Sequence, residues 1–179
     1  MVTRNLGSLY DEVGDRDAAV AAYTRAIKIL ERSSSTSANL ASYRGDLRRV
    51  LRTQGRLDAS LAATTAATEQ LSAMDPAPVL IEVPVLVAHA QTLLAMDRRN
   101  EARAAATRAV DMLRGDRPKH AGEALSVLAK IEYADGSPDV VVAPLVERAA
   151  EAFERAAPNI QPQAKEIRAW WTSVSQAAR

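Results

Sequence analysis

Five arginines lie close together near residue 50, and their spacing gives this chain its clearest opportunity for binding chemistry. Four of them recur every fourth residue, which aligns them along one side of a helix: Arg44, Arg48, Arg52 and Arg56. Arg49 stands beside this stripe. An arginine can grip a carboxylate through two parallel hydrogen bonds. The stripe therefore predicts either a surface paired with nearby acids, for which Asp11, Glu12 and Asp46 are candidates, or a site for an acidic or C-terminal carboxylate peptide.

No other group of side chains has the spacing of a catalytic or metal site. The two histidines, His89 and His120, are far apart, and the chain has no cysteine. Four acids surround one turn without the alternating oxygen ligands of a calcium loop: Asp11, Glu12, Asp15 and Asp17. Glycine-rich phosphate loops and nucleophile elbows are absent from the sequence. We therefore expect no enzyme, no metal and no cofactor.

The composition narrows the class of protein further. The net charge of +1 and the lack of aromatic residues among the arginines disfavour nucleic acid. No apolar run is long enough to cross a membrane, and residues 1–5 lack the pattern of a signal peptide, so the default location is the cytoplasm. Abundant alanine, with much more arginine than lysine, suggests a bacterial source.

A pattern of small and apolar residues recurs about every 42 residues. Its first copy is Leu6, Gly7, Tyr10, Gly14, Ala19, Tyr23 and Ala26. The second copy is Leu47, Leu51, Gly55, Ser60, Thr64 and Ala67, and the third is His89, Ala90, Leu93, Asp97, Ala102, Ala106 and Ala109. Because His89 falls where the pattern has leucine, we expect it in the core. A period of this length is typical of a solenoid of helix pairs, in which each pair buries its apolar face against the next.

The periodicity and the turn residues predict helices over residues 3–13, about 16–32, 38–54, 57–73, a segment ending at 96, 100–113, 119–134, a segment ending before 158, and 162–178. Pro84 is expected in the first turn of its helix, and Pro144 either begins a helix or lies inside a longer one. Ala149, Phe153 and Ala156 repeat the spacing of Ala19, Tyr23 and Ala26, but 47 residues after Ala102. We therefore expect about five extra residues in the fourth repeat, with Val140–Val142 as the insertion.

The first copy of the pattern resembles the tetratricopeptide repeat (TPR) family at seven positions: Leu6, Gly7, Tyr10, Gly14, Ala19, Tyr23 and Ala26. The resemblance implies an all-α, right-handed superhelical solenoid of about four antiparallel helix pairs. The repeats would cover residues 1–35, 36–76, 77–116 and 117–158 of one array spanning 1–179, with a capping helix at 160–178 in which Trp171 is the main covering residue. The period is longer than the usual thirty-four and looks like a bacterial variant with longer helices.

In TPR proteins the first helix of each pair lines a concave groove. The resemblance therefore implies that the groove is lined by Ser8, Asp11, Glu12, Arg49, Arg52, Pro84, Val87, Ala88, Gln91 and Leu94. It would change from acidic through basic to apolar along the array. Trp170 is out of phase with the apolar stripe of its helix, so it is a candidate anchor for an interface, or it lies over the preceding helix.

Two functions follow from these features. The first is a non-enzymatic scaffold that binds a peptide or helix in its concave groove, and the arginines would suit an acidic partner. The second is a regulatory or sensor array of a larger bacterial signalling ATPase or transcription regulator. The first helix begins almost at Met1 with no capping device, which suggests that this end packs against an upstream domain, a partner or a second copy of the chain.

Overall fold

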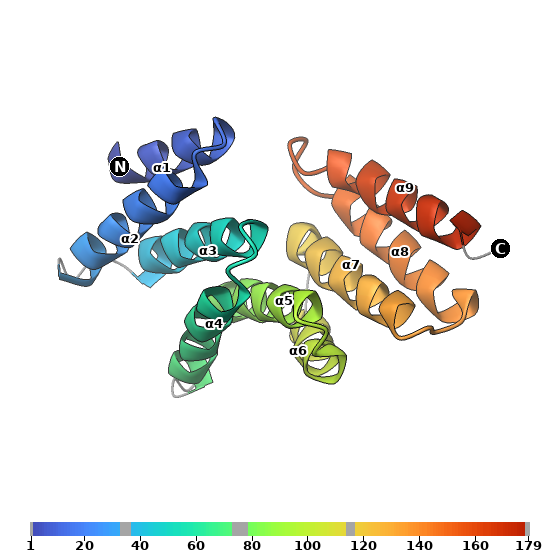
Figure 1. The fold of residues 1–179 in the computed structure, drawn as a ribbon. Coiled ribbons are helices and arrows are strands. Elements are labelled where there is room, and N and C mark those ends of the chain that lie inside the picture. The colour runs from blue at the N-terminus through green and yellow to red at the C-terminus, as the bar shows by residue number, and fades with distance from the viewer. Residues whose placement is uncertain (1, 33–36, 73–78, 114–116, 178–179) are drawn as a thin grey trace. The chain divides into compact units, whose positions relative to one another are not determined.

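The structure, a computed structural model, describes residues 2–32, 37–72, 79–113 and 117–177. Within these ranges it contains helices and no strand (Figure 1). The helices are α1 (Val2–Glu12), α2 (Arg16–Arg32), α3 (Ser37–Thr53), α4 (Leu57–Ser72), α5 (Val79–Ala95), α6 (Arg99–Asp111), α7 (Pro118–Ala134), α8 (Asp139–Glu154) and α9 (Pro162–Ala177). The prediction of an all-α fold built from helix pairs is confirmed. None of the described helices combines the length and the apolar character needed to cross a membrane.

The chain divides into two compact units, Met1–Ile81 and Glu82–Arg179, and each is described here by itself. In the first unit α2 packs against α1 and α3, and α3 packs against α4. In the second unit α7 packs against α6 and α8, and α8 packs against α9. Within each unit these helices therefore pack in series against their neighbours in the sequence, as in a solenoid. The single array over residues 1–179 stays a prediction.

A residue with a left-handed backbone ends the first helix of each pair. Gly14, Gly55 and Gly136 have φ values of 83°, 71° and 75°, where glycine has no steric penalty. Asp97 takes the same place in the third pair with φ 59°, a conformation that aspartate tolerates better than most residues. The four turn residues are 41, 42 and 39 positions apart in the sequence. The period therefore continues through the fourth pair.

The prediction of a five-residue insertion in the fourth repeat is wrong. Ala19 follows the turn residue of its repeat by five positions, and Val142 follows Gly136 by six. Val142 is fully buried, as Ala19 is, so it occupies the equivalent place with one extra residue in the turn. The equivalent of Tyr23 is then Val146, four positions after Val142. Phe153 matched the pattern in the sequence because it lies two helical turns after Val146 on the same helix.

The core of the first unit forms around Tyr23 on α2. Its buried members are Ala19, Tyr23, Ala26, Ile27, Tyr43 and Val50. Gly7 on α1 makes room for this ring, since a Cβ placed on Gly7 would lie 2.7 Å from a ring carbon of Tyr23. The glycine of the predicted repeat pattern is thus required by close packing of α1 on α2.

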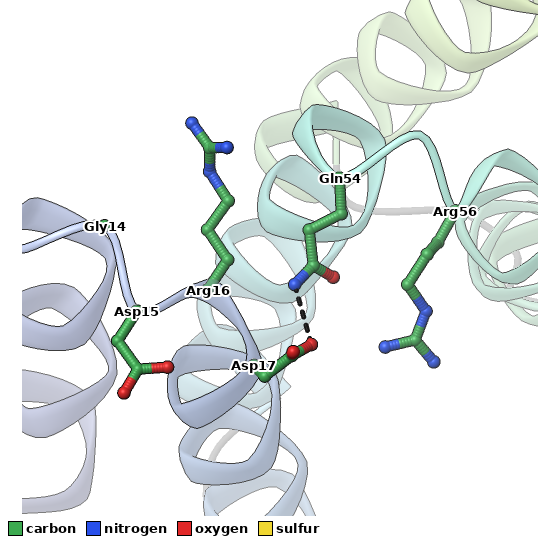
Figure 2. A pocket seen from close by; sticks show the side chains of 6 residues that line it. All are labelled: Gly14, Asp15, Arg16, Asp17, Gln54 and Arg56. Atoms are coloured by element: carbon green, nitrogen blue, oxygen red, sulfur yellow. Dashed lines mark hydrogen bonds between the residues drawn. The ribbon is translucent and has the colours of Figure 1, made fainter.

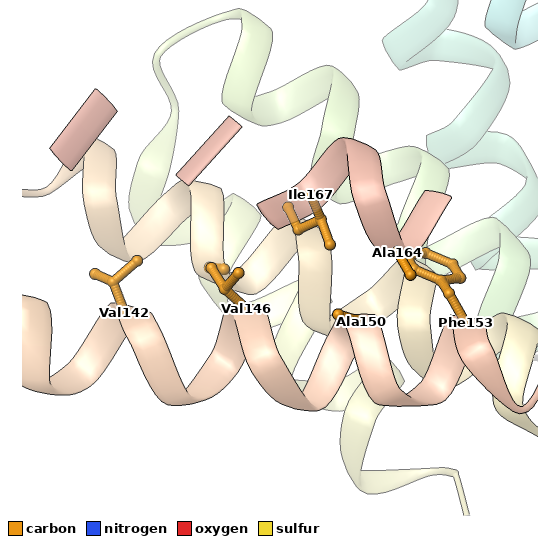
Figure 3. Packing of buried hydrophobic residues seen from close by; sticks show 7 residues of the cluster. Val142, Val146, Ala150, Phe153, Ala164 and Ile167 are labelled. Carbon is orange, nitrogen blue, oxygen red and sulfur yellow. The ribbon is translucent and has the colours of Figure 1, made fainter. Parts of the chain in front are cut away.

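The core of the second unit joins α7, α8 and α9. Its buried members are Ala129, Val142, Val146, Ala150, Phe153, Ala164 and Ile167. Figure 3 shows Ala164 and Ile167 of α9 lying against the α8 side chains of this cluster. Trp170 and Trp171 pack against it half-buried, so α9 covers α8 mainly through its small and branched residues, with Trp171 at the margin.

Pro84 and Pro144 both lie inside helices. Pro84 is the sixth residue of α5, so its prediction for the first turn is wrong, and Pro144 is the sixth residue of α8. A proline there removes one hydrogen bond to the carbonyl four residues earlier, at Leu80 and Val140. Both of those residues are strongly exposed, so water can satisfy the freed carbonyls. The helices extend upstream because doing so buries Val83 and Val142.

Candidate protein-binding surface

The described part of the first unit presents a charged surface where α1 and α3 meet. Arg49 Nη1 on α3 donates to Asp11 Oδ2 on α1 at 2.6 Å. Arg52 lies one helical turn after Arg49, on the same side of α3. Ser8 is half-buried on α1 beside Tyr23, and Glu12 is exposed. We call these five residues the α1–α3 surface: Ser8, Asp11, Glu12, Arg49 and Arg52.

Arg52 is the half-buried arginine of the α1–α3 surface that has no ion pair in the described ranges. Its side chain is half-buried, and no acidic side chain in the described ranges pairs with it. Burial lowers the pKa of Arg52, and the neighbouring charge of Arg49 lowers it further. Asp11 already balances Arg49. The formal charges of this surface sum to zero, but Arg52 has no ion pair in the described ranges, so its guanidinium donors are available to a carboxylate.

The arginine stripe does not form one solvated row. Arg44 donates to Glu31 on α2 at 2.9 Å, and Arg56 lies beyond the end of α3, after the turn residue Gly55. Arg48 is only 4% exposed, so the prediction of a surface residue is wrong for it. Burial, together with the charge of Arg44, lowers the pKa of Arg48 to about 10.

Arg48 is buried because it occupies the place that Gly7 holds in the first repeat, seven residues before the turn glycine. In the first repeat the ring of Tyr23 fills the space above that glycine. The residue equivalent to Tyr23 in the second repeat is Thr64, which is also buried. In the first repeat the large side chain is on the second helix of the pair, whereas in the second repeat it is on the first helix. The spacing of the repeats could have predicted this exchange of sizes.

A shallow polar pocket of about 450 Å³ lies at the turns of the same unit. Figure 2 shows its lining residues, which are Gly14, Asp15, Arg16, Asp17, Gln54 and Arg56. Gln54 Nε2 donates to Asp17 Oδ1 at 3.0 Å across the pocket. Asp15 accepts the backbone N–H of Ala18 and so caps α2. The pocket thus adds mixed charges at the turn end of α3.

The predicted groove residues of α5 belong to the second unit. Val87 is buried, whereas Gln91 and Leu94 are half-buried. The structure therefore brings together the α1 and α3 members of the predicted set and describes the α5 members separately. His89, predicted for the core, is half-buried on the same helix. His120 Nδ1 lies 3.3 Å from Glu123 Oε2 on α7.

Trp170 lies against α7. Its ring meets that of Tyr133 edge-on at a centroid distance of 5.7 Å, and Lys130 Nζ lies 5.6 Å from the Trp170 centroid. Lysine and tyrosine contacts of this kind hold a tryptophan in place within its own chain. A role as an interface anchor stays a prediction.

A network of ion pairs joins α6 to α7 in the second unit, and sequence reasoning did not find it. Arg103 donates to Glu132 Oε1 at 2.7 Å and pairs with Asp135 Oδ2 at 2.5 Å. Arg99 donates to the carbonyl oxygen of Ala134 at 2.5 Å, and Ser137 donates to Glu132 Oε2 at 2.6 Å. Every acid here has a cation or hydroxyl partner. The network is thus a structural link between repeats.

We expect this network to make the second unit sensitive to acid. The hydrogen bond from Arg103 is the main cause that lowers the pKa of Glu132, and Ser137 lowers it further. A lowered pKa in the folded state means that the Glu132 carboxylate stabilises the fold above its ordinary pKa of 4.5, and that this stabilisation is lost as the pH falls through the folded value. Unfolding free energies measured from neutral pH down to about pH 3 should therefore fall more steeply for the natural chain than for Glu132→Gln. Parallel pH profiles for the two proteins would contradict this assignment.

Comparison with known proteins agrees with the helix-pair architecture. The sequence profile of the tetratricopeptide repeat matches residues 5–29, which hold most of α1 and α2. Two crystal structures of MamA have a similar fold. One has a TM-score of 0.53 at 15% identity and covers 97% of this chain and 98% of that chain. The other has a TM-score of 0.51 at 15% identity and covers 93% and 86%. No curated protein sequence matches the chain. Residues 5–29 therefore carry the sequence pattern of a tetratricopeptide repeat, and the chain as a whole shares the helix-pair fold of the MamA structures.

Proposed function

We propose that this protein is an interaction scaffold whose α1–α3 surface binds an acidic segment of a protein partner. The TPR fold supports a scaffold role in general. The observation that carries the finer proposal is the half-buried guanidinium of Arg52, which has no acidic partner in the described ranges and lies next to Arg49. A carboxylate brought by a partner would give Arg52 the kind of ion-pair partner that Asp11 gives Arg49.

The chemistry of the surface favours a carboxylate over other anions. Two arginines one helical turn apart offer planar donor pairs that match carboxylate oxygens. The net charge of the whole chain is only +1, so attraction is local to this surface and does not extend over the molecule as it does in nucleic-acid-binding proteins. Glu12 at the margin would repel a densely acidic ligand. A partner segment with one or two carboxylates on one helical face therefore fits best.

The experiment compares a labelled helical peptide carrying two glutamates four residues apart with the same peptide carrying glutamines. Fluorescence anisotropy with the full chain should show at least about tenfold tighter binding of the glutamate peptide, which corresponds to about 1.4 kcal/mol. Replacing Arg49 and Arg52 together with alanine should remove this preference while helicity measured by circular dichroism stays unchanged. A preference that survives the double substitution would refute the site.

A matched control separates local recognition from net charge. Arg25 and Arg148 are exposed and have no ion pair in the described parts of the chain. Their joint replacement with alanine changes the net charge by the same amount as the loss of Arg49 and Arg52. Binding of the glutamate peptide should be unaffected in this control. Equal loss in both double variants would show that attraction is non-specific.

A further inference from the structure

One arginine is buried at a position where the other three helix pairs have a small residue. Seven residues before the turn residue of each pair stand Gly7, Arg48, Ala90 and Ala129. Ala90 and Ala129 are fully buried, and Arg48 is only 4% exposed. The guanidinium of Arg48 on α3 is therefore removed from water. A charge in such a place needs a partner of opposite charge, because burying it alone costs far more than burying an apolar group.

The described residues do not supply this partner. The Nε and Nη1 atoms of Arg48 are buried and make no hydrogen bond among them. The charge of Arg44 repels that of Arg48, and Asp46 is two residues away on α3, a spacing that puts side chains on different sides of a helix. Burial is the main cause that lowers the pKa of Arg48 to about 10, so this side chain stays charged at neutral pH. Water molecules would accept the hydrogen bonds, but they would not balance the charge.

Gly45 leaves open space beside the guanidinium. Gly45 lies three residues before Arg48, and helical side chains point back toward the start of their helix, so the Arg48 side chain extends toward this glycine. A Cβ placed on Gly45 would lie 3.5 Å from Arg48 Nη2. Apart from the adjoining residues and the helix backbone, no other described atom lies within 4 Å of that Cβ. Gly45 is half-buried, so a small ion has both a place beside the guanidinium and a route to it.

We infer that Arg48 binds a small monovalent anion, such as chloride, in the space beside Gly45. The ion accepts hydrogen bonds from the guanidinium and supplies the negative charge that the described residues do not provide. Because it binds only the folded chain, it stabilises the first unit. Arg48 is buried whereas Arg49 is exposed, so this site is separate from the α1–α3 surface. Binding of the glutamate peptide therefore does not test it.

Thermal unfolding of the full chain in chloride tests the site. Circular dichroism is recorded at constant ionic strength while sodium chloride, up to about 200 mM, replaces sodium gluconate, whose anion is too large for the space beside Gly45. The midpoint should rise by about 3–6 °C and then level off, as expected for one saturable site. A midpoint that does not rise with chloride overturns the inference. So does a rise that never levels off, because a general salt effect does not saturate.

Arg48→Met assigns the effect to this residue. Methionine keeps an unbranched side chain and removes the charge. The midpoint of the variant should not depend on chloride, and in gluconate alone it should be at least as high as that of the natural chain, because no unbalanced charge is buried. Arg25→Met is the matched control, since Arg25 is exposed on α2 and its loss changes the net charge equally. Its midpoint should rise with chloride as that of the natural chain does. The same chloride dependence in both variants would show that Arg48 does not hold the ion.

Line widths in chlorine NMR test binding without reference to stability. Chloride that exchanges with a protein site has a broader resonance than free chloride. The natural chain and Arg25→Met should broaden this resonance more than Arg48→Met does, and bromide, an ion of similar size, should reverse the broadening by competition. If Arg48→Met does not fold, competition in the natural chain still decides the matter, because broadening that bromide fails to reverse contradicts a specific site.

Discussion

Replacing Gly122 with alanine should destabilise the second unit by about 1–2 kcal/mol, although the same change in an open helix stabilises. A Cβ on Gly122 would lie 2.5 Å from two ring carbons of Phe153, which is itself buried. Overpacking of this kind costs about 1–3 kcal/mol, and the gain in helix propensity of about 1 kcal/mol offsets it only in part. Both tryptophans are in α9, so denaturant unfolding followed by tryptophan fluorescence reports on this unit.

Gly45 provides the control of opposite sign. It lies inside α3, and a Cβ there would meet only the Nη2 atom of Arg48, at 3.5 Å, which is ordinary contact. Gly45→Ala should therefore stabilise the first unit by up to about 1 kcal/mol, measured by circular dichroism. Adding Phe153→Leu to Gly122→Ala should recover part of the loss, so that the double variant is more stable than the sum of the single effects predicts. Strict additivity would show that the ring is not the cause.

Replacing Arg108 with alanine should have the largest effect on stability of any single surface arginine, at about 3 kcal/mol. Arg108 on α6 pairs with Glu82 on α5, whose side chain is only 5% exposed. Removing the cation leaves a buried carboxylate without its partner, and breaking a buried pair in this way costs about 3–5 kcal/mol. Arg108 is itself 57% exposed, which favours the lower end of that range. Denaturant midpoints of the natural chain and of the variant measure the effect.

The pair of Arg98 and Glu101 is the matched control. Its N···O distance is 2.7 Å, but the two side chains are 42% and 57% exposed. Arg98→Ala should shift the denaturant midpoint far less than Arg108→Ala does, because water screens an exposed pair. Replacing Glu82 and Arg108 together with methionine should restore most of the stability, since the uncompensated charge is then absent. A loss at Arg98 as large as that at Arg108 would contradict the role of burial.

The sequence predicted the helices and their pairing well because both depend on local signals. Alanine-rich stretches, apolar residues at helical spacing and a turn residue near every forty-second position mark each pair. The backbone at these turn residues, Gly14, Gly55, Asp97 and Gly136, is left-handed. The same signals place Arg49 and Arg52 one helical turn apart on one side of α3. Each of these features is determined by residues within one or two turns of each other.

The errors arose where packing between helices outweighed a local preference. Pro84 and Pro144 are inside helices because burying Val83 and Val142 outweighs one lost hydrogen bond at an exposed carbonyl. A sequence match alone could not distinguish Val146 from Phe153 as the equivalent of Tyr23, since both lie on the same stripe of α8.

The sequence by itself determined that this chain is a series of helix pairs, with arginines that could bind a carboxylate. Only the tertiary structure decided which arginines remain available. Glu31 neutralises Arg44, burial removes Arg48 from the surface, and Asp11 reaches Arg49 from a helix 38 residues away in sequence. The sequence specifies which side chains carry a charge. Its partners and its exposure depend on which helices pack together, because solvation and pairing act over distances that the order of residues does not specify.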